Sequence, residues 1–220
     1  MSESQLIERT IEGLHESLLH SLSHISYDTP VLDIGCGTGA WLERLANAGF
    51  TKLYGIDKYA EQIGTKKATC WAADIDWDNH LGLGDRKFGL ITAIEVVEHL
   101  ENPGRLYYYV SKHLEEGGYF LMTTPNIHSV DCRLKFMLTG RLKSFDYKGD
   151  PTHISPVLLT CMERVLPRHS LQIVKTWGYP EKGSLVSRPA TKIISAMLKT
   201  IFKEEYYGDT LCLLLKNQKS

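Results

Sequence analysis

The sequence predicts an α/β fold with a seven-stranded, mainly parallel sheet and helices on both faces. Two observations predict this class: short apolar runs alternate with helical stretches, and a glycine-rich segment follows the first run. The 220 residues suffice for one hydrophobic core, and no repeat or low-complexity linker divides them. We expect one domain over 1–220, composed of an N-terminal helical cover (1–28), a ligand-binding core (29–125), a lid insertion after the fifth strand (126–152) and C-terminal helices and strands (153–220).

Seven short apolar runs are predicted to be the strands. The first five alternate with helical segments, which favours parallel strands joined by crossover helices. The last two are expected to complete the sheet at one edge. The expected strands are Val31–Ile34, Lys52–Ile56, Ala68–Ala72, Phe88–Ile94, Tyr119–Thr123, Leu171–Thr176 and Thr210–Leu215.

Apolar residues at helical spacing predict the helices. An amphipathic N-terminal helix is expected to lie over the domain through Leu6, Ile7, Ile11, Leu14, Leu18, Leu19 and Leu22. The other expected helices are Trp41–Ala48, Ala60–Thr65, Gly104–Leu114, Pro156–Leu166 and Ser187–Phe202. Asn126–Thr152 fits neither a helical nor a strand period and directly follows a strand, so we expect it to cover the substrate.

Composition excludes several classes of protein and partner. The net charge of −1 disfavours a nucleic-acid partner. The five cysteines are scattered without a CxxC pair, which argues against a disulfide framework and a zinc ribbon. Neither a signal peptide nor an apolar run long enough to span a bilayer is visible. A cytoplasmic enzyme is the default expectation, and its oligomeric state is left open.

The glycine-rich segment from Asp33 to Gly39 reads DIGCGTG and opens a predicted helix. Gly35, Gly37 and Gly39 permit positive φ angles and let a ligand approach the backbone closely. Ligands of open α/β sheets bind at this edge, outside the carboxyl ends of the strands. Taken alone, the segment also fits a tight turn or a dinucleotide site.

Acidic residues end the next two predicted strands. Asp57 ends the second, where a carboxylate can accept hydrogen bonds from a ribose diol. Asp74 and Ile75 end the third, where an acid can accept from an exocyclic amine while an apolar side chain covers an adenine. Such features at three successive strand ends indicate a nucleoside-containing ligand.

The segments VLDIGCGTG, YGID, AADI, FGLITAIEVVEHL and LEEGGYFLMTTPN resemble the successive motifs of class I S-adenosylmethionine (SAM)-dependent methyltransferases. The resemblance implies a Rossmann-like sheet with a reversed terminal hairpin and SAM as the cofactor. It implies that Asp33 and Gly35 lie at the methionine portion, Asp57 at the ribose, and Asp74 with Ile75 at the adenine. The expected cofactor-binding residues are Asp33, Gly35, Cys36, Gly37, Gly39, Asp57, Asp74, Ile75 and Glu95.

The segment EVVEH follows the fourth predicted strand. If it is helical, Glu95, Glu98 and His99 share one face, where they could hold a divalent cation such as Mg²⁺. The alternative is that Glu95 faces the cofactor, Glu98 caps or pairs, and His99 packs against the sheet. EVVEH is similar to the metal-binding segment of ubiquinone-biosynthesis O-methyltransferases and small-RNA 2′-O-methyltransferases, which by order and context adds His153 as a fourth ligand.

The reacting side of the pocket is expected to use a histidine. His99 or His153 could accept a proton from an oxygen nucleophile near neutral pH. The insertion interleaves basic and apolar residues, which fits a lid for an anionic or lipid-linked acceptor and leaves peripheral membrane contact open. The leading hypothesis is O-methylation of a small-molecule, sugar or lipid-linked acceptor; RNA 2′-O-methylation and a non-catalytic SAM-binding regulatory module are the alternatives. The acceptor, and O- against N- or C-methylation, are left open.

Overall fold

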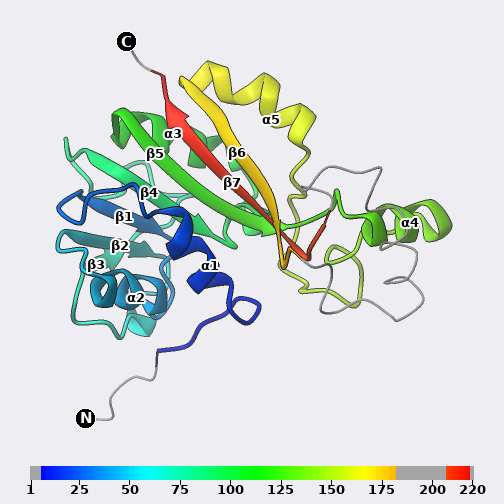
Figure 1. The fold of residues 1–220 in the computed structure, drawn as a ribbon, viewed down its shortest axis with the longest axis horizontal. Coiled ribbons are helices and arrows are strands. Elements are labelled where there is room, and N and C mark those ends of the chain that lie inside the picture. Colours follow the sequence, from blue (N-terminus) through cyan, green and yellow to red (C-terminus); the bar gives the residue numbers. More distant parts are fainter. Residues whose placement is uncertain (1–5, 182–206, 219–220) are drawn as a thin grey trace.

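The computed structural model describes residues 6–181 and 207–218 and contains the predicted seven-stranded sheet (Figure 1). The strand order is β3-β2-β1-β4-β5-β7-β6. Neighbouring strands are parallel from β3 to β5, whereas β7 runs antiparallel to both β5 and β6. The reversed terminal hairpin is therefore confirmed. The strands are β1 (Val31–Ile34), β2 (Leu53–Asp57), β3 (Thr69–Ala72), β4 (Phe88–Ile94), β5 (Leu114–Pro125), β6 (Leu171–Tyr179) and β7 (Thr210–Asn217).

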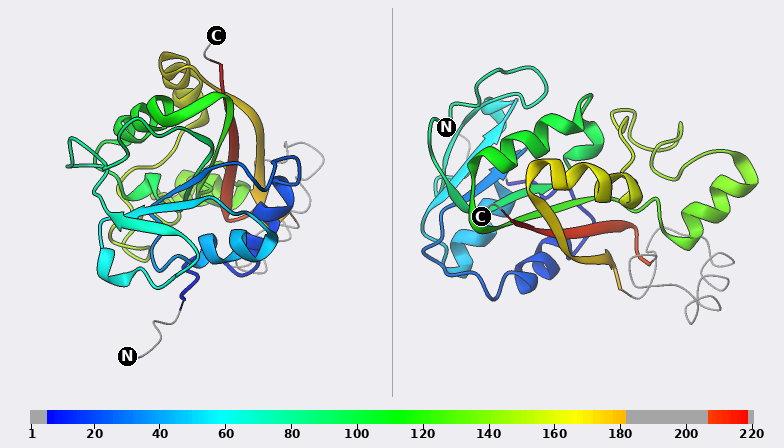
Figure 2. Two further views of the ribbon diagram at one scale, coloured as in Figure 1. Left: turned by 90° about the vertical axis from the view of Figure 1, so that its left-hand side faces the viewer. Right: turned by 90° about the horizontal axis from the view of Figure 1, so that it is seen from above.

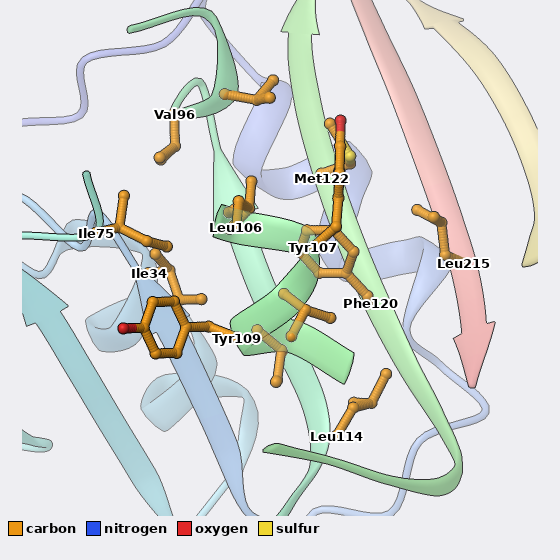
Figure 3. Packing of buried hydrophobic residues seen from close by; sticks show 14 of the residues in the cluster. Ile34, Ile75, Val96, Leu106, Tyr107, Tyr109, Leu114, Phe120, Met122 and Leu215 are labelled. Atoms are coloured by element: carbon orange, nitrogen blue, oxygen red, sulfur yellow. The ribbon is translucent and has the colours of Figure 1, made fainter. Parts of the chain in front are cut away.

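Helices cover both faces of the sheet (Figure 2, right). One buried cluster of apolar side chains joins α1 and α2 to one face of the sheet, and a second cluster joins α3 and α5 to the other face. Figure 3 shows part of the second cluster, in which Leu106 and Tyr107 of α3 pack against Phe120 and Met122 of β5. Each face thus has its own hydrophobic core. The described helices are α1 (Leu14–Ser21), α2 (Ala40–Ala48), α3 (Pro103–His113), α4 (Val130–Thr139) and α5 (Leu159–Val165), with short 3₁₀ helices η1 (Ala60–Gln62), η2 (Val97–His99) and η3 (Leu166–His169).

The N-terminal helix is shorter than the sequence predicts. It begins at Leu14, directly after Gly13, whose φ of 77° ends any continuous helix there. Ile7, expected to be helical, instead pairs through its backbone with Thr38. The apolar spacing before Gly13 therefore did not predict a helix correctly, because contact with another loop determines the conformation of this segment.

The expected helix over Ala60–Thr65 is also wrong beyond its first turn. Only η1 forms, because the N–H of Gly64 donates to the carbonyl of Thr38 at 3.0 Å rather than to a helical partner. Thr65 donates its hydroxyl to Glu43 of α2 at 2.9 Å. The expected helix Ser187–Phe202 lies outside the described residues.

The predicted insertion contains α4, which extends beyond the ends of β5 and β7 (Figure 1). Ser129 caps this helix by accepting a hydrogen bond from the N–H of Cys132 at 3.3 Å. Across residues 6–181 and 207–218, no helix has both the length and the apolar character needed to cross a bilayer.

Candidate cofactor and acceptor site

The carboxyl ends of β1 and β2 carry the glycine-rich loop. Gly35, Gly37 and Gly39 have φ angles of 73°, 54° and 87°, in the left-handed region that favours glycine. A Cβ on Gly35 would meet Val96 at 2.6 Å, and one on Gly39 would meet Thr65 at 2.3 Å, whereas nothing lies within 4 Å of one on Gly37. The loop thus has packed ends and an open centre at Gly37, where a ligand can approach the backbone.

Asp57, at the end of β2, holds this loop in place. One of its carboxylate oxygens accepts the N–H of Gly37 at 2.8 Å, and the other accepts the N–H of Tyr59 at 2.8 Å. A carboxylate has about four acceptor positions, so lone pairs are left over for a ribose diol. Asp57 is half-buried and lies at the strand end, as the predicted ribose contact requires.

Asp33 lies at the end of β1, 3% exposed. The hydroxyl of Thr92, its neighbour on β4, donates to it at 2.6 Å. Burial raises the pKa of Asp33 from 3.8 to about 7, since the Thr92 hydrogen bond offsets only part of the desolvation and Asp57 adds repulsion. A nearby cation, such as the ammonium group of an amino acid, would stabilise the ionised form.

Asp74 and Ile75 follow β3 in a turn that α3 fixes. Arg105 donates to the carbonyl of Ile75 at 2.7 Å and also to the carbonyl of Asp78. The hydroxyl of Tyr109 donates to the same Asp78 carbonyl, at 2.9 Å. These α3 side chains fix the turn that carries the predicted adenine contacts. No sequence signal marked this role, because Arg105 reads as a solvated helix residue and Tyr109, 5% exposed, reads as a core residue.

The N-terminal segment lies directly against the glycine-rich loop. Thr38 accepts the N–H of Ile7 at 2.9 Å and donates its hydroxyl to the carbonyl of Ile7 at 3.2 Å. Glu8 adds an ion pair with Arg44 of α2 at 3.1 Å. The N-terminal segment thus contacts the loop through non-helical backbone before α1 rather than through a helix.

The EVVEH segment is not one helical face. Glu95 has a φ of 53°, and only Val97–His99 form a 3₁₀ turn. The carboxylate of Glu95 instead accepts the hydroxyl of Thr123 on β5 at 2.9 Å. The condition for a shared helical face of Glu95, Glu98 and His99 is therefore not met, because the left-handed residue Glu95 ends the strand with a sharp turn.

Glu98 is fully buried, and within the described residues neither of its carboxyl oxygens makes a hydrogen bond of ordinary geometry. Burial raises its pKa well above the ordinary value, and the Glu95 carboxyl raises it further. A buried carboxyl without such hydrogen bonds is costly unless it is protonated or meets a cation. The Glu95 carboxyl and the Thr124 hydroxyl interact with Glu98, but neither satisfies its oxygens with a hydrogen bond of ordinary geometry, so this carboxyl is an under-satisfied polar group beside the two histidines.

His99 and His153 meet beside Glu98. Their ring centroids are 4.7 Å apart in a T-shaped contact, although the two residues are 54 positions apart in the chain. Glu98, His99 and His153 each offer one ligand atom, and these three atoms lie within 4.8 Å of one another. Three of the four predicted metal ligands therefore come together, and Glu95 lies outside this group.

Hydrogen bonds fix which ring nitrogen each histidine offers. Nδ1 of His153 lies 3.0 Å from the carbonyl of Ser144, which can only accept. Nδ1 of His99 lies 2.8 Å from the hydroxyl of Thr152, which itself donates to Asp150 at 2.6 Å. Both Nδ1 atoms therefore carry a hydrogen, which leaves Nε2 as the nitrogen through which each imidazole can bind a cation or a proton.

The pKa of His99 is lowered by its burial and by the neighbouring His153. A neutral ring at physiological pH can accept a proton or bind a cation. The chain returning from the insertion is fixed at the same place, since the N–H groups of Ile154 and Ser155 both donate to the carbonyl of Glu98 at 2.9 Å.

The insertion presents apolar side chains to solvent. Phe136, Met137 and Leu138 on α4 are 51%, 72% and 77% exposed, and Tyr147 nearby is 74% exposed. Arg141 lies over the Tyr147 ring, 5.0 Å from its centroid. Beside these residues is a hollow of about 400 Å³ lined by Phe136, Gly140, Arg141, Leu142, Phe145, Asp146 and Tyr147.

A buried ionic triad ties the insertion to the sheet. Lys143 lies 2.6 Å from the carboxylate of Asp131 on α4 and 2.7 Å from that of Asp209, which directly precedes β7. Both acids are 9% exposed at their side chains. The triad therefore joins α4 to the start of β7. Asp209, the residue before that strand, lies 66 residues after Lys143 in the chain.

Comparisons with known proteins place these features in a family context. Residues 7–176 match the family described as "Methyltransferase domain". The chain is 25% identical over 144 residues to a ubiquinone biosynthesis O-methyltransferase of Hydrogenovibrio crunogenus, covering 61% of this chain and 59% of that protein. A mitochondrial protein of the same name from Dictyostelium discoideum is 29% identical over 114 residues, 44% of this chain and 35% of the relative. The chain thus spans about half the length of these relatives or less.

A solved structure of a SAM-dependent methyltransferase from Archaeoglobus fulgidus superimposes with a TM-score of 0.67 at 20% identity. The alignment covers 94% of each chain. At this identity the likeness supports the fold alone, and it agrees with the strand order and the reversed hairpin described above.

Proposed function

This chain belongs to the methyltransferase-domain family and is a SAM-dependent methyltransferase, and we propose that it methylates an oxygen atom of a small-molecule, sugar or lipid-linked acceptor. The observation that carries the proposal is the pair His99 and His153, each with a free Nε2 lone pair beside the strand ends. The relatives named as O-methyltransferases support the same choice of oxygen.

For the cofactor, we assign the predicted residues at the three strand ends. SAM, when bound, supplies an electrophilic methyl group on a positively charged sulfur. Gly37 would admit the cofactor to the backbone, and Asp57 would accept the ribose hydroxyls with its remaining lone pairs. Asp33 would face the ammonium group of the methionine portion, where a cation favours its ionised form.

For the acceptor, we assign proton removal to His99 or His153. Methyl transfer needs an oxygen held in line and partly dehydrated more than it needs strong acid–base chemistry. A neutral imidazole within hydrogen-bond reach of the acceptor hydroxyl can take its proton as the oxygen attacks. The lowered pKa of His99 supports this role, since the ring is then neutral near pH 7.

As the alternative to a free histidine base, we propose that Glu98, His99 and His153 hold a divalent cation, since an imidazole whose Nε2 binds a metal cannot also take the proton. The under-satisfied carboxyl of Glu98 and the two Nε2 lone pairs form a fitting donor set. Two imidazoles with one carboxylate favour a transition metal over Mg²⁺, which prefers oxygen ligands. A cation there would lower the pKa of an acceptor hydroxyl and orient it. Glu95, hydrogen-bonded to Thr123, is left to the cofactor side.

The insertion supports an amphiphilic acceptor. Its exposed apolar side chains, Phe136, Met137 and Leu138, adjoin a hollow that Arg141 also lines. Apolar surface beside a cation suits a molecule with a hydrocarbon part and an anionic group, as in a lipid-linked sugar. Residues 126–152 would then act as the lid over the acceptor.

The test is transfer of isotope-labelled methyl from SAM to three acceptors: a phenol, a free sugar and a lipid-linked sugar. We expect label on oxygen, fastest with the lipid-linked sugar. Label on nitrogen or carbon, or on RNA alone, would contradict the proposal.

The metal is tested in the same assay by Glu98→Gln and His153→Ala, each with and without EDTA. We expect EDTA and both substitutions to lower turnover by about 100-fold, a typical loss for one acid–base or metal contribution. His80→Ala, an exposed loop histidine, is the matched control. If EDTA has no effect while His153→Ala is inactive, the histidine acts as a base without a metal.

A further inference from the structure

Two cysteine sulfurs meet beneath the cofactor loop. A Cβ on Gly55, in the middle of β2, would lie 2.9 Å from Sγ of Cys36 and 2.9 Å from Sγ of Cys70. Gly55 pairs with Cys70 in the β2–β3 register, and the N–H of Cys36 donates to the carbonyl of Ile56 at 3.0 Å. The two thiols, together with Leu42 of α2, therefore fill the space that a side chain at position 55 would occupy.

The two thiols are chemically different. Cys36 is 7% exposed, whereas Cys70 is half-buried. The Cys36 thiol donates a hydrogen bond to the Cys70 sulfur, which lowers the pKa of Cys70 and raises that of Cys36. A thiolate is the form that reacts with oxidants, so Cys70 is the thiol that reacts first and Cys36 lies next to it.

We propose that Cys36 and Cys70 are an oxidisable dithiol, and that the disulfide between them weakens SAM binding. The oxidant is a peroxide. The Cys70 thiolate attacks a peroxide oxygen, the O–O bond breaks, and the sulfur becomes a sulfenic acid; the hydroxide that leaves takes up the proton that the Cys70 thiol had lost and departs as one water. The Cys36 sulfur then attacks the Cys70 sulfur, the S–OH bond breaks, and a second water leaves with the Cys36 proton. One peroxide thus oxidises two thiols to one disulfide.

Bond formation has to move the cofactor loop. A disulfide is about 2.05 Å long, much shorter than a thiol–thiol hydrogen bond. Because β2 lies between β1 and β3, Cys36 can reach Cys70 only if the loop shifts towards β3. Cys36 lies between Gly35, which is packed against Val96, and Gly37, whose N–H is held by Asp57. A shift of Cys36 therefore disturbs both ends of the loop that approaches the cofactor.

The experiment measures SAM binding to the full chain by calorimetry before and after hydrogen peroxide, and again after dithiothreitol. This inference rests on the cofactor of the proposed function but not on its acceptor, so a failure to methylate oxygen leaves it standing. We expect a Cys36–Cys70 peptide by mass spectrometry, a dissociation constant raised by about tenfold or more, and full recovery on reduction.

Cys70→Ser removes the more reactive thiol without altering a residue assigned to the cofactor. We expect this variant to bind SAM normally and to be insensitive to peroxide. Cys161→Ser, which replaces an exposed cysteine on α5, is the control and should stay sensitive. If the bridge forms and the dissociation constant does not change, or if Cys70→Ser remains sensitive to peroxide, the inference is overturned.

Discussion

The hydroxyl of Thr92 on β4 lies 2.6 Å from the carboxylate of Asp33 on β1, and both side chains are buried. This hydrogen bond joins neighbouring strands at the edge of the sheet where the cofactor is expected. It stabilises the ionised carboxylate only in part, since burial still raises the pKa of Asp33 to about 7.

Replacing Asp33 with asparagine is expected to stabilise the protein at pH 8. The folded pKa of about 7 exceeds the unfolded value of 3.8, so between these values the folded state binds more protons. The contribution of Asp33 to stability therefore falls as pH rises through this window. Denaturant unfolding of both proteins should show a gain for Asp33→Asn of at most about 4 kcal/mol at pH 8, and much less at pH 4. An equal difference at both pH values would contradict the assignment.

Replacing Arg105 with methionine is expected to weaken SAM binding. The guanidinium fixes the turn that carries Asp74 and Ile75 by donating to the carbonyls of Ile75 and Asp78. If the loss of these hydrogen bonds weakens the binding free energy of SAM by about 1–1.5 kcal/mol, the dissociation constant rises by about tenfold. Arg86→Met is the matched control, because Arg86 donates to the carbonyls of Gly82 and Leu83, further along the same β3–β4 connection and away from Asp74 and Ile75. Equal affinities of the two variants in calorimetry would refute the role of Arg105.

Replacing Thr38 with valine is expected to release the N-terminal segment. The variant keeps the shape of the side chain but loses both hydrogen bonds to Ile7, each typically contributing about 1 kcal/mol. Trypsin should then cleave after the exposed Arg9 several-fold faster, because local opening becomes easier. Thr51→Val removes an exposed hydroxyl that contacts the carbonyl of Tyr27 and serves as the control. Unchanged cleavage in Thr38→Val would show that other contacts hold the segment.

Replacing Lys143 with methionine is expected to loosen the insertion. The change removes the cation between Asp131 and Asp209 and leaves two mostly buried carboxylates to repel each other. Because Lys143 is 23% exposed, we expect a loss of about 1–3 kcal/mol rather than the larger cost of a fully buried pair. Hydrogen exchange should rise over residues 130–139 and stay unchanged in β1. Lys148→Met, an exposed lysine of the same insertion, should show no such rise.

The sheet was predictable because its strands are buried runs with turn residues between them. Val31–Ile34 and Phe88–Ile94 have the predicted bounds. The segment before Gly13 was not, because its conformation depends on a hydrogen bond to Thr38, 31 residues away. The spacing of apolar residues along the chain carries no information about such a contact. The early end of η1 was missed for the same reason, because it depends on the hydrogen bond from Gly64 to the carbonyl of Thr38.

For the site, the residue types were predictable and the local geometry was not. Asp33 and Asp57 lie within the last two residues of β1 and β2, whereas Asp74, expected to end the third strand, follows the end of β3 by two residues; what these carboxylates bind stays a prediction. The helical face predicted for Glu95 failed because a positive φ at a non-glycine residue leaves no mark in the sequence. His153 was proposed from its order in the chain, and its ring lies against His99. Arg105 and Tyr109 gave no signal, since their role exists only once α3 lies against the turn after β3.

The backbone carbonyl of Glu98 accepts the N–H groups of both Ile154 and Ser155, so the insertion rejoins the domain at a main-chain attachment next to His153. This attachment uses main-chain atoms alone, so it fixes the end of the insertion whatever side chains the insertion carries. Because main-chain hydrogen bonds do not depend on side-chain identity, the side chains of residues 130–150 can change while His153 keeps its position beside His99. Under the proposed function, substitutions in residues 130–150 would change which acceptor binds without displacing the histidine pair.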